Sequence, residues 1–261
     1  MNKVKIISTG EAQQAFLDEL HENFNSIGTT LQGGRNEVKV VDCGAQKLCV
    51  KSFGKPTLAN TFIYSFIRKT KAERSYLHAL QLLEMGVDTP QPISYIEVKN
   101  RWGILKNAYY ISDFDPGMYD VSHLLSTEVE DRALIIDQFI DFVIHDLHAQ
   151  GILHKDFNGG NILVHKGPER NYRFALIDIN RMSFNHEFNR RAKIKNVQSL
   201  TSDVDALIYL AKRYAEIEQK NFGDVVMPLL SVKNFLGKKR HYTKKFLHGL
   251  KRIFLQKKLQ H

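Results

Sequence analysis

The sequence predicts a two-lobed α+β protein, because its candidate strands cluster in the first half of the chain and most of its candidate helices lie in the second. A hairpin is expected over residues 36–53, where apolar and polar side chains alternate and the pattern breaks from Asp42 to Gln46. Two further strands are expected over residues 93–98 and 108–114, joined by a turn near Asn100. This order favours a small β-rich N-lobe and a mostly helical C-lobe with a cleft between them.

One helix is expected in the first half of the chain, over residues 57–85, which contain neither Gly nor Pro. Gly86 follows directly and is a helix stop. The apolar stripe of this helix consists of Tyr76, Leu77, Leu80 and Leu83.

The second half of the chain predicts two helices, over residues 131–149 and 202–219, with a short strand pair between them at residues 162–164 and 174–177. Gly151 is the stop of the first helix. The expected apolar faces contain Leu134, Phe139, Val143 and Leu147 in the first helix, and Leu207, Leu210 and Tyr214 in the second.

We expect one domain over residues 1–261, since this length is enough for two lobes that share a cleft. The turn signal Asp115-Pro116-Gly117 is the expected junction between the lobes. The N-lobe would cover about residues 1–114 and the C-lobe about residues 118–235. A basic helical tail would follow over about residues 236–261.

Composition favours a cytoplasmic protein. No stretch of 18 apolar residues occurs, so no transmembrane helix is expected, and the N-terminal residues lack the apolar core of a secretory signal. The two cysteines, Cys43 and Cys49, are six residues apart, an even spacing that could place both on one face of a strand. They imply no disulfide scaffold, and a reducing compartment is expected.

The net charge of +9 comes from the C-terminal region. From Val225 to His261 there are ten Lys and Arg and no Asp or Glu, which leaves 27 basic against 28 acidic residues in the rest of the chain. Phe246, Leu250, Ile253 and Phe254 fall at helical spacing among these charges. The tail could therefore lie on an anionic membrane surface, or pack on the C-lobe as an ordinary terminal helix. No base-reading motif accompanies the charge, so nucleic acid binding is not expected.

The segment His154-Lys155-Asp156-Phe157-Asn158-Gly159-Gly160-Asn161 fits the H-x-D-x-x-x-x-N pattern of a kinase catalytic loop. It follows a long predicted helix and precedes an apolar strand, which is the context that this loop requires. Asp156 could accept a proton from a substrate hydroxyl, and Asn161 could bind a metal from the same loop. His154 is the first residue of the motif and a candidate member of the catalytic site.

Asp178 follows the second apolar run, in the sequence Leu176-Ile177-Asp178-Ile179-Asn180. A carboxylate at the end of such a strand can present itself to Mg²⁺ that bridges the phosphates of ATP. The position resembles the Asp of the D-F-G motif but reads D-I-N, which puts the glycine-dependent switch of regulated protein kinases in doubt.

The first half of the chain supplies two candidate partners for this site. Lys51 lies in an apolar strand and resembles the lysine that contacts the α- and β-phosphates. Glu73 follows 22 residues later on the predicted helix and could hold Lys51 by an ion pair. Each alone would more often be a solvated surface charge, and only their order relative to Asp156 and Asp178 favours a function.

The loop that would cover the nucleotide is less distinct. Gly33 and Gly34 precede Arg35 and Asn36, just before the predicted hairpin, and the full G-x-G-x-x-G pattern is missing. A nucleotide-covering loop and a plain turn are equally compatible with these residues.

Several segments together resemble the lipopolysaccharide core (Kdo/heptose) kinase family of Gram-negative bacteria, within the protein-kinase-like superfamily. The resemblance covers about residues 33–200. It implies ATP and Mg²⁺ as cofactors, and a hydroxyl of an inner-core sugar on lipid A as acceptor, at the cytoplasmic face of the inner membrane. The segments that carry it are Val50–Phe53, Lys71–Tyr76, Gly86–Ile93, Asp156–Leu163 and Asp178–Met182.

The region after Asp178 bears on the acceptor. It contains no A-P-E-like segment, and it is basic at Arg181 and over residues 190–195, which could contact an anionic sugar or form a solvated face. An antibiotic phosphotransferase-like or Rio-like kinase is an alternative, although an antibiotic kinase would need an acidic acceptor pocket. A nucleotide-binding pseudokinase is a second alternative, against which the retained candidate residues argue.

Overall fold

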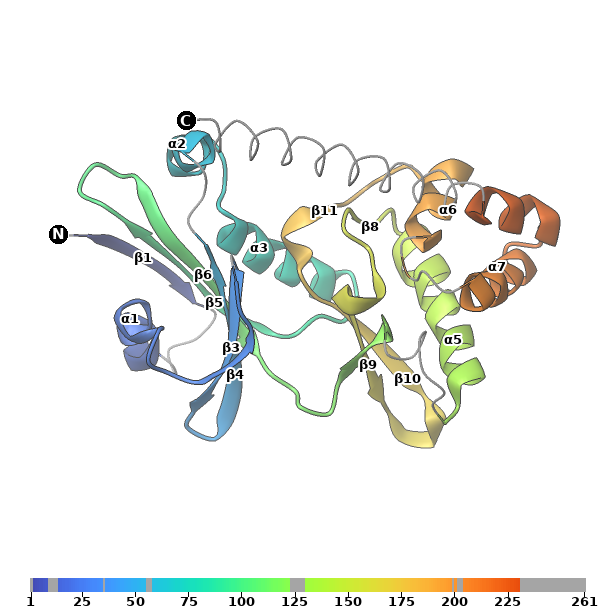
Figure 1. Cartoon of the computed structure of the whole chain (residues 1–261), viewed down its shortest axis with the longest axis horizontal. Coiled ribbons are helices and arrows are strands. Elements are labelled where there is room, and N and C mark those ends of the chain that lie inside the picture. Colours follow the sequence, from blue (N-terminus) through green and yellow to red (C-terminus); the bar gives the residue numbers. More distant parts are fainter. Residues whose placement is uncertain are drawn as a thin grey trace, which may run out of the picture.

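The computed structural model describes residues 2–8, 14–34, 36–54, 58–122, 130–198, 200 and 204–230. These residues form two lobes, a sheet-rich lobe built from the first half of the chain and a helical lobe with short strands built from the second (Figure 1). The two-lobed α+β fold that the sequence predicts is thus confirmed.

A six-stranded antiparallel sheet forms the N-lobe, with the strand order β1-β5-β6-β4-β3-β2. The predicted hairpin is present as β3 and β4, which turn at Gly44 with a φ of +63°. Asn100 holds the predicted β5–β6 turn, because its side-chain oxygen accepts from the backbone of Trp102 and Ile104. The strands are β1 (Lys3–Ser8), β2 (Thr29–Gln32), β3 (Asn36–Cys43), β4 (Gln46–Phe53), β5 (Pro92–Lys99) and β6 (Leu105–Asp113).

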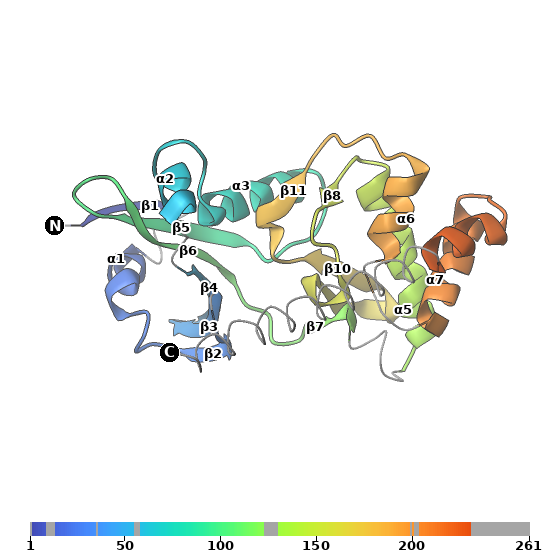
Figure 2. The same ribbon diagram turned by 45° about the horizontal axis from the view of Figure 1, so that its top comes forward.

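Helices cover both faces of this sheet (Figures 1 and 2). On one face, α1 (Gln14–Asn23) packs Leu17 and Leu20 on buried β-branched side chains of the sheet, including Ile96 and Ile111. On the other face, Tyr76 of the next helical segment lies against Tyr95, with ring centroids 5.4 Å apart. Neither β1 nor α1 was expected from the sequence. Of the two, β1 is an edge strand whose side chains are largely exposed.

The single helix expected over residues 57–85 is wrong, since the structure has α2 (Leu58–Phe66) and α3 (Lys71–Glu84) there. Thr70 starts α3 as its N-cap, and its hydroxyl oxygen accepts from the Glu73 backbone N–H at 3.1 Å. A cap needs neither Gly nor Pro, so the lack of these residues does not exclude a helix break.

The expected apolar stripe of this segment is also partly wrong. Leu80 is 38% exposed, and the side chains that α3 buries include Ala72, Ala79 and Leu82 besides Tyr76. Gly86 does end the helix as expected, in a left-handed conformation with a φ of +76°.

The C-lobe packs its helices around one apolar core. The two predicted helices are confirmed, as are the paired strands between them, β9 and β10. The first helix changes from α to π at Phe142, and the backbone N–H of Ala149 donates to the Ile144 carbonyl. The elements are α5 (Arg132–Asp141), the π-helix η1 (Phe142–His148), α6 (Arg190–Gln198), α7 (Val204–Ile217), β7 (Tyr119–Asp120), β8 (Leu153–His154), β9 (Ile162–Lys166), β10 (Tyr172–Leu176) and β11 (Met182–Ser183).

The lobes are joined by the predicted turn at Asp115, whose carboxylate accepts from the Gly117 N–H at 2.8 Å, and by one further contact. The loop between α3 and β5 binds the end of β10, where Thr89 Oγ1 donates to the Leu176 carbonyl at 2.7 Å. The backbone N–H of Leu176 in turn donates to the Asp88 carbonyl at 2.9 Å. These contacts fix the strand that leads into Asp178.

Cys43 and Cys49 lie on the two opposite strands of the β3–β4 hairpin and are free thiols. The expectation that they could share one face of a single strand is wrong, because the turn at Gly44 separates them. Among the described helices, none is long and apolar enough to cross a membrane. The basic tail helix expected after residue 235 lies outside the described residues.

Candidate active site

An ion pair joins the two lobes at the centre of the candidate site. Lys51 Nζ lies 2.6 Å from Asp178 Oδ1, although 126 residues separate the two in the chain. Lys51 comes from β4 in the N-lobe and Asp178 follows β10 in the C-lobe. Their side chains are 17% and 30% exposed, so the pair is partly shielded from water but open on one side.

Asp178 is held as an anion. Burial raises the pKa of its carboxyl, but the charge of Lys51 and hydrogen bonds from Lys51 and Asn180 outweigh burial and leave the pKa below its ordinary value. Both bonds end on Oδ1, with Asn180 Nδ2 at 2.7 Å, and Oδ2 makes no hydrogen bond to a described residue. Asp178 has a φ of +53°, a left-handed conformation that is uncommon for an aspartate and typical of functional turns.

His154 fixes the start of the catalytic loop and connects it to Asp178. The ring is buried, its Nε2 bonds to the Ile177 carbonyl at 3.0 Å, and its Nδ1 accepts from the Asp156 backbone N–H at 3.1 Å. Burial lowers the pKa of this imidazole, which agrees with a neutral ring that carries its proton on Nε2. The ring thus ties Asp156 to the residue immediately before Asp178.

The side chains of Asp156 and Asn161 come from one tight loop. Asn161 Nδ2 donates to the Asp156 backbone carbonyl at 2.8 Å, and the Ile177 N–H donates to the Asn161 carbonyl at 3.0 Å. Asn161 therefore lies beside the segment that carries Asp178. The Asp156 carboxylate is exposed and makes no hydrogen bond or ion pair with the described residues, so it can accept a proton from a substrate hydroxyl.

The two ends of this loop are fixed by backbone contacts. Strands β8 and β11 pair, so that His154 lies opposite Met182, and the Lys155 N–H donates to the Arg181 carbonyl at 3.0 Å. A Cβ at Gly159 would lie 2.8 Å from Ser122 Oγ, so the loop can approach the chain there only without a side chain. The catalytic loop and the segment around Asp178 are therefore held as one unit.

Glu73 does not form the ion pair with Lys51 that the sequence suggested. Lys51 pairs with Asp178 instead, and within the described residues no bond joins it to Glu73. The helix that carries Glu73 reaches the site through another residue, because His78 Nδ1 lies 2.7 Å from the Ile179 carbonyl. Burial lowers the pKa of His78, so a neutral ring donates this bond from Nδ1.

Gly33 and Gly34 lie in the connection between β2 and β3, at the open edge of the N-lobe sheet. A Cβ at either glycine would meet no atom within 4 Å, and Gly34 has a φ of +116°. The connection thus has room to approach a ligand, and its role over a nucleotide stays a prediction.

The basic segment after Asp178 is only partly available to an acceptor. Arg181 is exposed, whereas Lys193 Nζ lies 2.8 Å from Glu218 Oε1 and ties α6 to the end of α7. Burial raises the pKa of Glu218, yet bonds from Lys193 and Lys220 outweigh it and lower the pKa. Lys193 therefore has a structural partner, and Arg181 is the described basic residue of this segment that is free to meet an anion.

Sequence reasoning missed three residues that support the site. Asn180 holds the Asp178 carboxylate and has a buried Oδ1 without a hydrogen-bond partner. Asn196 of α6 donates to the His154 carbonyl at 3.4 Å, and its own carbonyl lies 3.1 Å from His148 Nε2. The D-I-N spacing could have indicated Asn180, but no local pattern relates Asn196 or His148 to the loop.

A metal ion would have few protein ligands here. The described residues contain no group of three or more His, Cys, Asp and Glu side chains that could hold a metal. Asp178 Oδ2 and the Asn161 side-chain oxygen are the donors that the two loops offer. This set suits Mg²⁺, which is usually bound through one or two side-chain oxygens and completed by phosphate and water.

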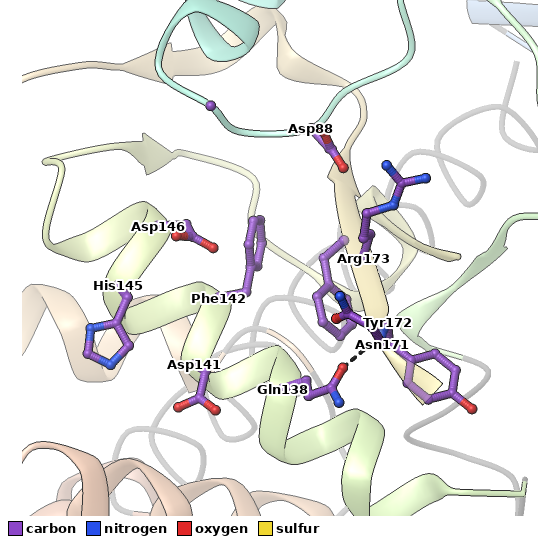
Figure 3. A pocket seen from close by; sticks show the side chains of 11 residues that line it. Asp88, Gln138, Asp141, Phe142, His145, Asp146, Asn171, Tyr172 and Arg173 are labelled. Atoms are coloured by element: carbon purple, nitrogen blue, oxygen red, sulfur yellow. Dashed lines mark hydrogen bonds between the residues drawn. The ribbon is translucent and has the colours of Figure 1, made fainter. Parts of the chain in front are cut away.

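A separate pocket of about 390 Å³ lies where α5 and η1 face β10 and the loop between α3 and β5 (Figure 3). None of the candidate catalytic residues lines it. Asp88 and Arg173 lie on one side of it, and Asp141, His145 and Asp146 lie on the other (Figure 3). The pocket is therefore separate from the candidate site around Asp178.

The two-lobed fold is that of the kinase-like class of proteins. The chain belongs to the lipopolysaccharide kinase (Kdo/WaaP) family, whose model matches residues 13–221. This membership confirms the resemblance drawn from the motif residues, makes the protein a kinase, and supports lipopolysaccharide core as its class of acceptor.

A solved structure of another protein agrees with this fold. A structure described as WaaP in complex with acyl carrier protein is similar, with a TM-score of 0.58 at 14% identity over 90% of this chain and 98% of that chain. The complex of Rio2 kinase with ADP/Mg²⁺-phosphoaspartate from Chaetomium thermophilum gives a TM-score of 0.42 at 18% identity, over 88% of this chain and 81% of the other. A search of curated proteins returned no relative of the chain.

Proposed function

We propose that the protein transfers the γ-phosphate of ATP to a hydroxyl of an inner-core sugar, Kdo or heptose, on a lipid A-linked acceptor. The observation that carries this proposal is the Lys51–Asp178 pair beside the loop of Asp156 and Asn161, in a chain of the lipopolysaccharide kinase family. The reaction would take place at the cytoplasmic face of the inner membrane, where ATP is available.

The residues at the lobe junction fit a magnesium nucleotide. Lys51 would supply a cation for the phosphates, and Asp178 with Asn161 would supply oxygen ligands for the metal. The buried, unpartnered Oδ1 of Asn180 and the free Oδ2 of Asp178 show that this site has polar atoms still to be satisfied. Bound Mg²⁺ would neutralise charge that develops on the phosphoryl group during transfer.

The chain's own residues would act mainly by position. Asp156 would orient the acceptor hydroxyl and accept its proton, since its carboxylate is exposed and unpaired. Lys51 would leave Asp178 and bind the phosphates when the nucleotide enters. One ammonium group cannot fully neutralise both the Asp178 carboxylate and the phosphates. His154 and Asn180 would keep the two loops in register throughout.

The proposal is tested by incubating the full chain with ATP, Mg²⁺ and Kdo-lipid A, and measuring the acceptor by mass spectrometry. A mass gain of one phosphate group on Kdo-lipid A, and none on lipid A that lacks the sugar, is the expected result. Equal phosphorylation of both acceptors would move the reaction away from the core sugar. Absence of transfer to Kdo-lipid A and to its heptose-extended form would overturn the proposal.

A further inference from the structure

An exposed apolar surface lies at the outer end of the N-lobe. It is formed by α2, which carries Phe62 and Phe66, by Ile67 just after it, and by Trp102 in the β5–β6 turn. These four side chains are 60%, 57%, 72% and 68% exposed, respectively, which is unusual for large apolar residues in a soluble fold. We call this set of four residues the α2 patch.

The structure brings together the two segments that carry the α2 patch, although they are distant in the sequence. The Leu105 N–H at the start of β6 donates to Ser65 Oγ of α2 at 2.8 Å. A Cβ at Gly103 would lie 3.4 Å from the ring of Phe66, so this ring lies against the β5–β6 turn. Figures 1 and 2 show α2 beside that turn, on the face of the sheet opposite α1. Phe62 and Phe66 also pack together, with ring centroids 5.3 Å apart.

The chain segments that carry the α2 patch contain only positive charges. Residues 43–72 and 98–112, which contain both segments, include no Asp or Glu. Arg68 and Lys69 follow α2, and Arg101 and Lys106 flank Trp102; all four are exposed. The Arg101 guanidinium lies 4.7 Å from the centre of the Trp102 ring, which places a cation at the edge of the apolar surface. A partner of this surface must therefore be apolar at its centre and anionic at its rim.

We propose that the α2 patch docks the kinase on an anionic membrane surface. Exposed Trp and Phe side chains bordered by Lys and Arg are the composition by which helices lie in the membrane interface, with rings among the head groups and cations on lipid phosphates. The choice of a membrane over a second protein rests on the proposed function, because a lipid A-linked acceptor is presented there. The docking would bring the lobe that carries Lys51 to the lipid surface.

The first test measures binding to vesicles without any substrate. The full chain is sedimented with phosphatidylglycerol-containing vesicles and with neutral vesicles, at low and at high salt. The wild-type protein should bind the anionic vesicles more strongly, and salt should weaken this binding. The double variant Ile67→Ser/Trp102→Ser should bind roughly tenfold more weakly or worse, because two exposed anchors are removed. Arg68→Glu/Lys69→Glu should lose the preference for anionic lipid.

A matched control is Leu31→Ser, because Leu31 is 56% exposed on β2, at the far edge of the same sheet. This variant should bind vesicles as the wild type does. Equal binding by the Ile67→Ser/Trp102→Ser protein would overturn the proposal, and so would absence of vesicle binding by the wild type. A wild-type dimer that the same double variant converts to a monomer, with unchanged vesicle binding, would show that a second copy covers the patch.

A second readout separates this inference from the proposed function. The rate of phosphate transfer is compared on acceptor embedded in vesicles and on a delipidated core oligosaccharide in solution. The double variant should lose rate on the embedded acceptor and keep the wild-type rate on the soluble one. Equal rates of wild type and variant on the embedded acceptor would contradict docking through the patch. Absence of transfer by the wild type to either acceptor would instead count against the proposed function.

Discussion

Asp156 combines a proposed catalytic role with a minor role in the fold. Its carboxylate is exposed and bonds to no described residue, whereas its backbone carries the hydrogen bonds that shape the loop. Asp156→Asn should therefore leave the melting temperature unchanged and lower phosphate transfer by about 10²–10⁴-fold, the usual contribution of a positioned general base. Transfer rates and thermal unfolding of the same preparation check both statements. Transfer at the wild-type rate would show that another group accepts the proton.

His148 is a second residue with a measurable consequence. The ring is buried beneath α6, its Nε2 bonds to Asn196, and its Nδ1 has no partner among the described residues. Burial is the main cause that lowers the pKa of this imidazole from 6.5 to about 4. The folded protein therefore keeps a neutral ring at pH values where the unfolded chain already binds a proton.

This difference makes stability depend on pH in a definite direction. Between pH 6.5 and about 4 the unfolded state binds more protons at His148, so stability falls as the pH is lowered, by roughly 3 kcal/mol in total. Unfolding by denaturant at several pH values should show a shallower loss in His148→Gln than in the wild type. His145→Gln is the matched control, because His145 is exposed on the same helix. An identical pH dependence of wild type and His148→Gln would contradict the buried neutral ring.

At the scale of elements, α3 connects the candidate site to the N-lobe. Thr70 caps its N-terminus. At its C-terminus, the backbone N–H of Met85 donates to the Gln81 carbonyl, and Gly86 follows. Between these ends, His78 bonds to the Ile179 carbonyl in the segment that holds Asp178. A loss of order at the start of α3 should therefore disturb the segment that holds Asp178.

The cap of α3 gives the prediction that belongs to this scale. Thr70→Ala removes the oxygen that accepts from the Glu73 N–H and should lower the free energy of unfolding by about 1 kcal/mol. Thr70→Ser keeps that oxygen and should stay close to the wild type. Denaturant unfolding of the three proteins provides the measurement. Equal destabilisation by both substitutions would assign the effect to the lost methyl group and not to the cap.

The elements show where a local pattern is sufficient to predict structure. The β3–β4 hairpin and the helices α5 and α7 were predicted, because alternation and helical spacing report directly on which side chains are buried. The break between α2 and α3 was not, since it depends on a cap. The edge strand β1 was missed because most of its side chains are exposed and carry little pattern.

For the whole molecule, the candidate site exists only where both lobes meet. The order of Lys51, Asp156, Asn161 and Asp178 along the chain was enough to propose the site from the sequence. The ion pair was not predicted correctly, because the motif pattern offers two acidic partners for Lys51. The structure pairs Lys51 with Asp178 and not with Glu73. Contacts from distant helices, such as Asn196 on the His154 carbonyl, leave no local trace in the sequence.

Under the proposed function, the ion pair that joins the lobes would open when a nucleotide enters, and this yields the last prediction. Asp178 is proposed to hold Mg²⁺, while in the structure it holds Lys51 at 2.6 Å. In Asp178→Asn, Mg²⁺ should no longer strengthen ATP binding, because the anionic ligand is lost. Binding of ATP without metal should be kept or become tighter, because Lys51 is released for the phosphates.

Isothermal titration with Mg²⁺ and with a chelator measures both parts of this prediction. Asp146→Asn serves as the control, since Asp146 lines the pocket between η1 and β10, which the candidate catalytic residues do not line. It should retain the full effect of Mg²⁺ on ATP affinity. If Mg²⁺ strengthens ATP binding equally in Asp178→Asn and in the wild type, the metal is held elsewhere, and the ion pair between the lobes has only a structural role.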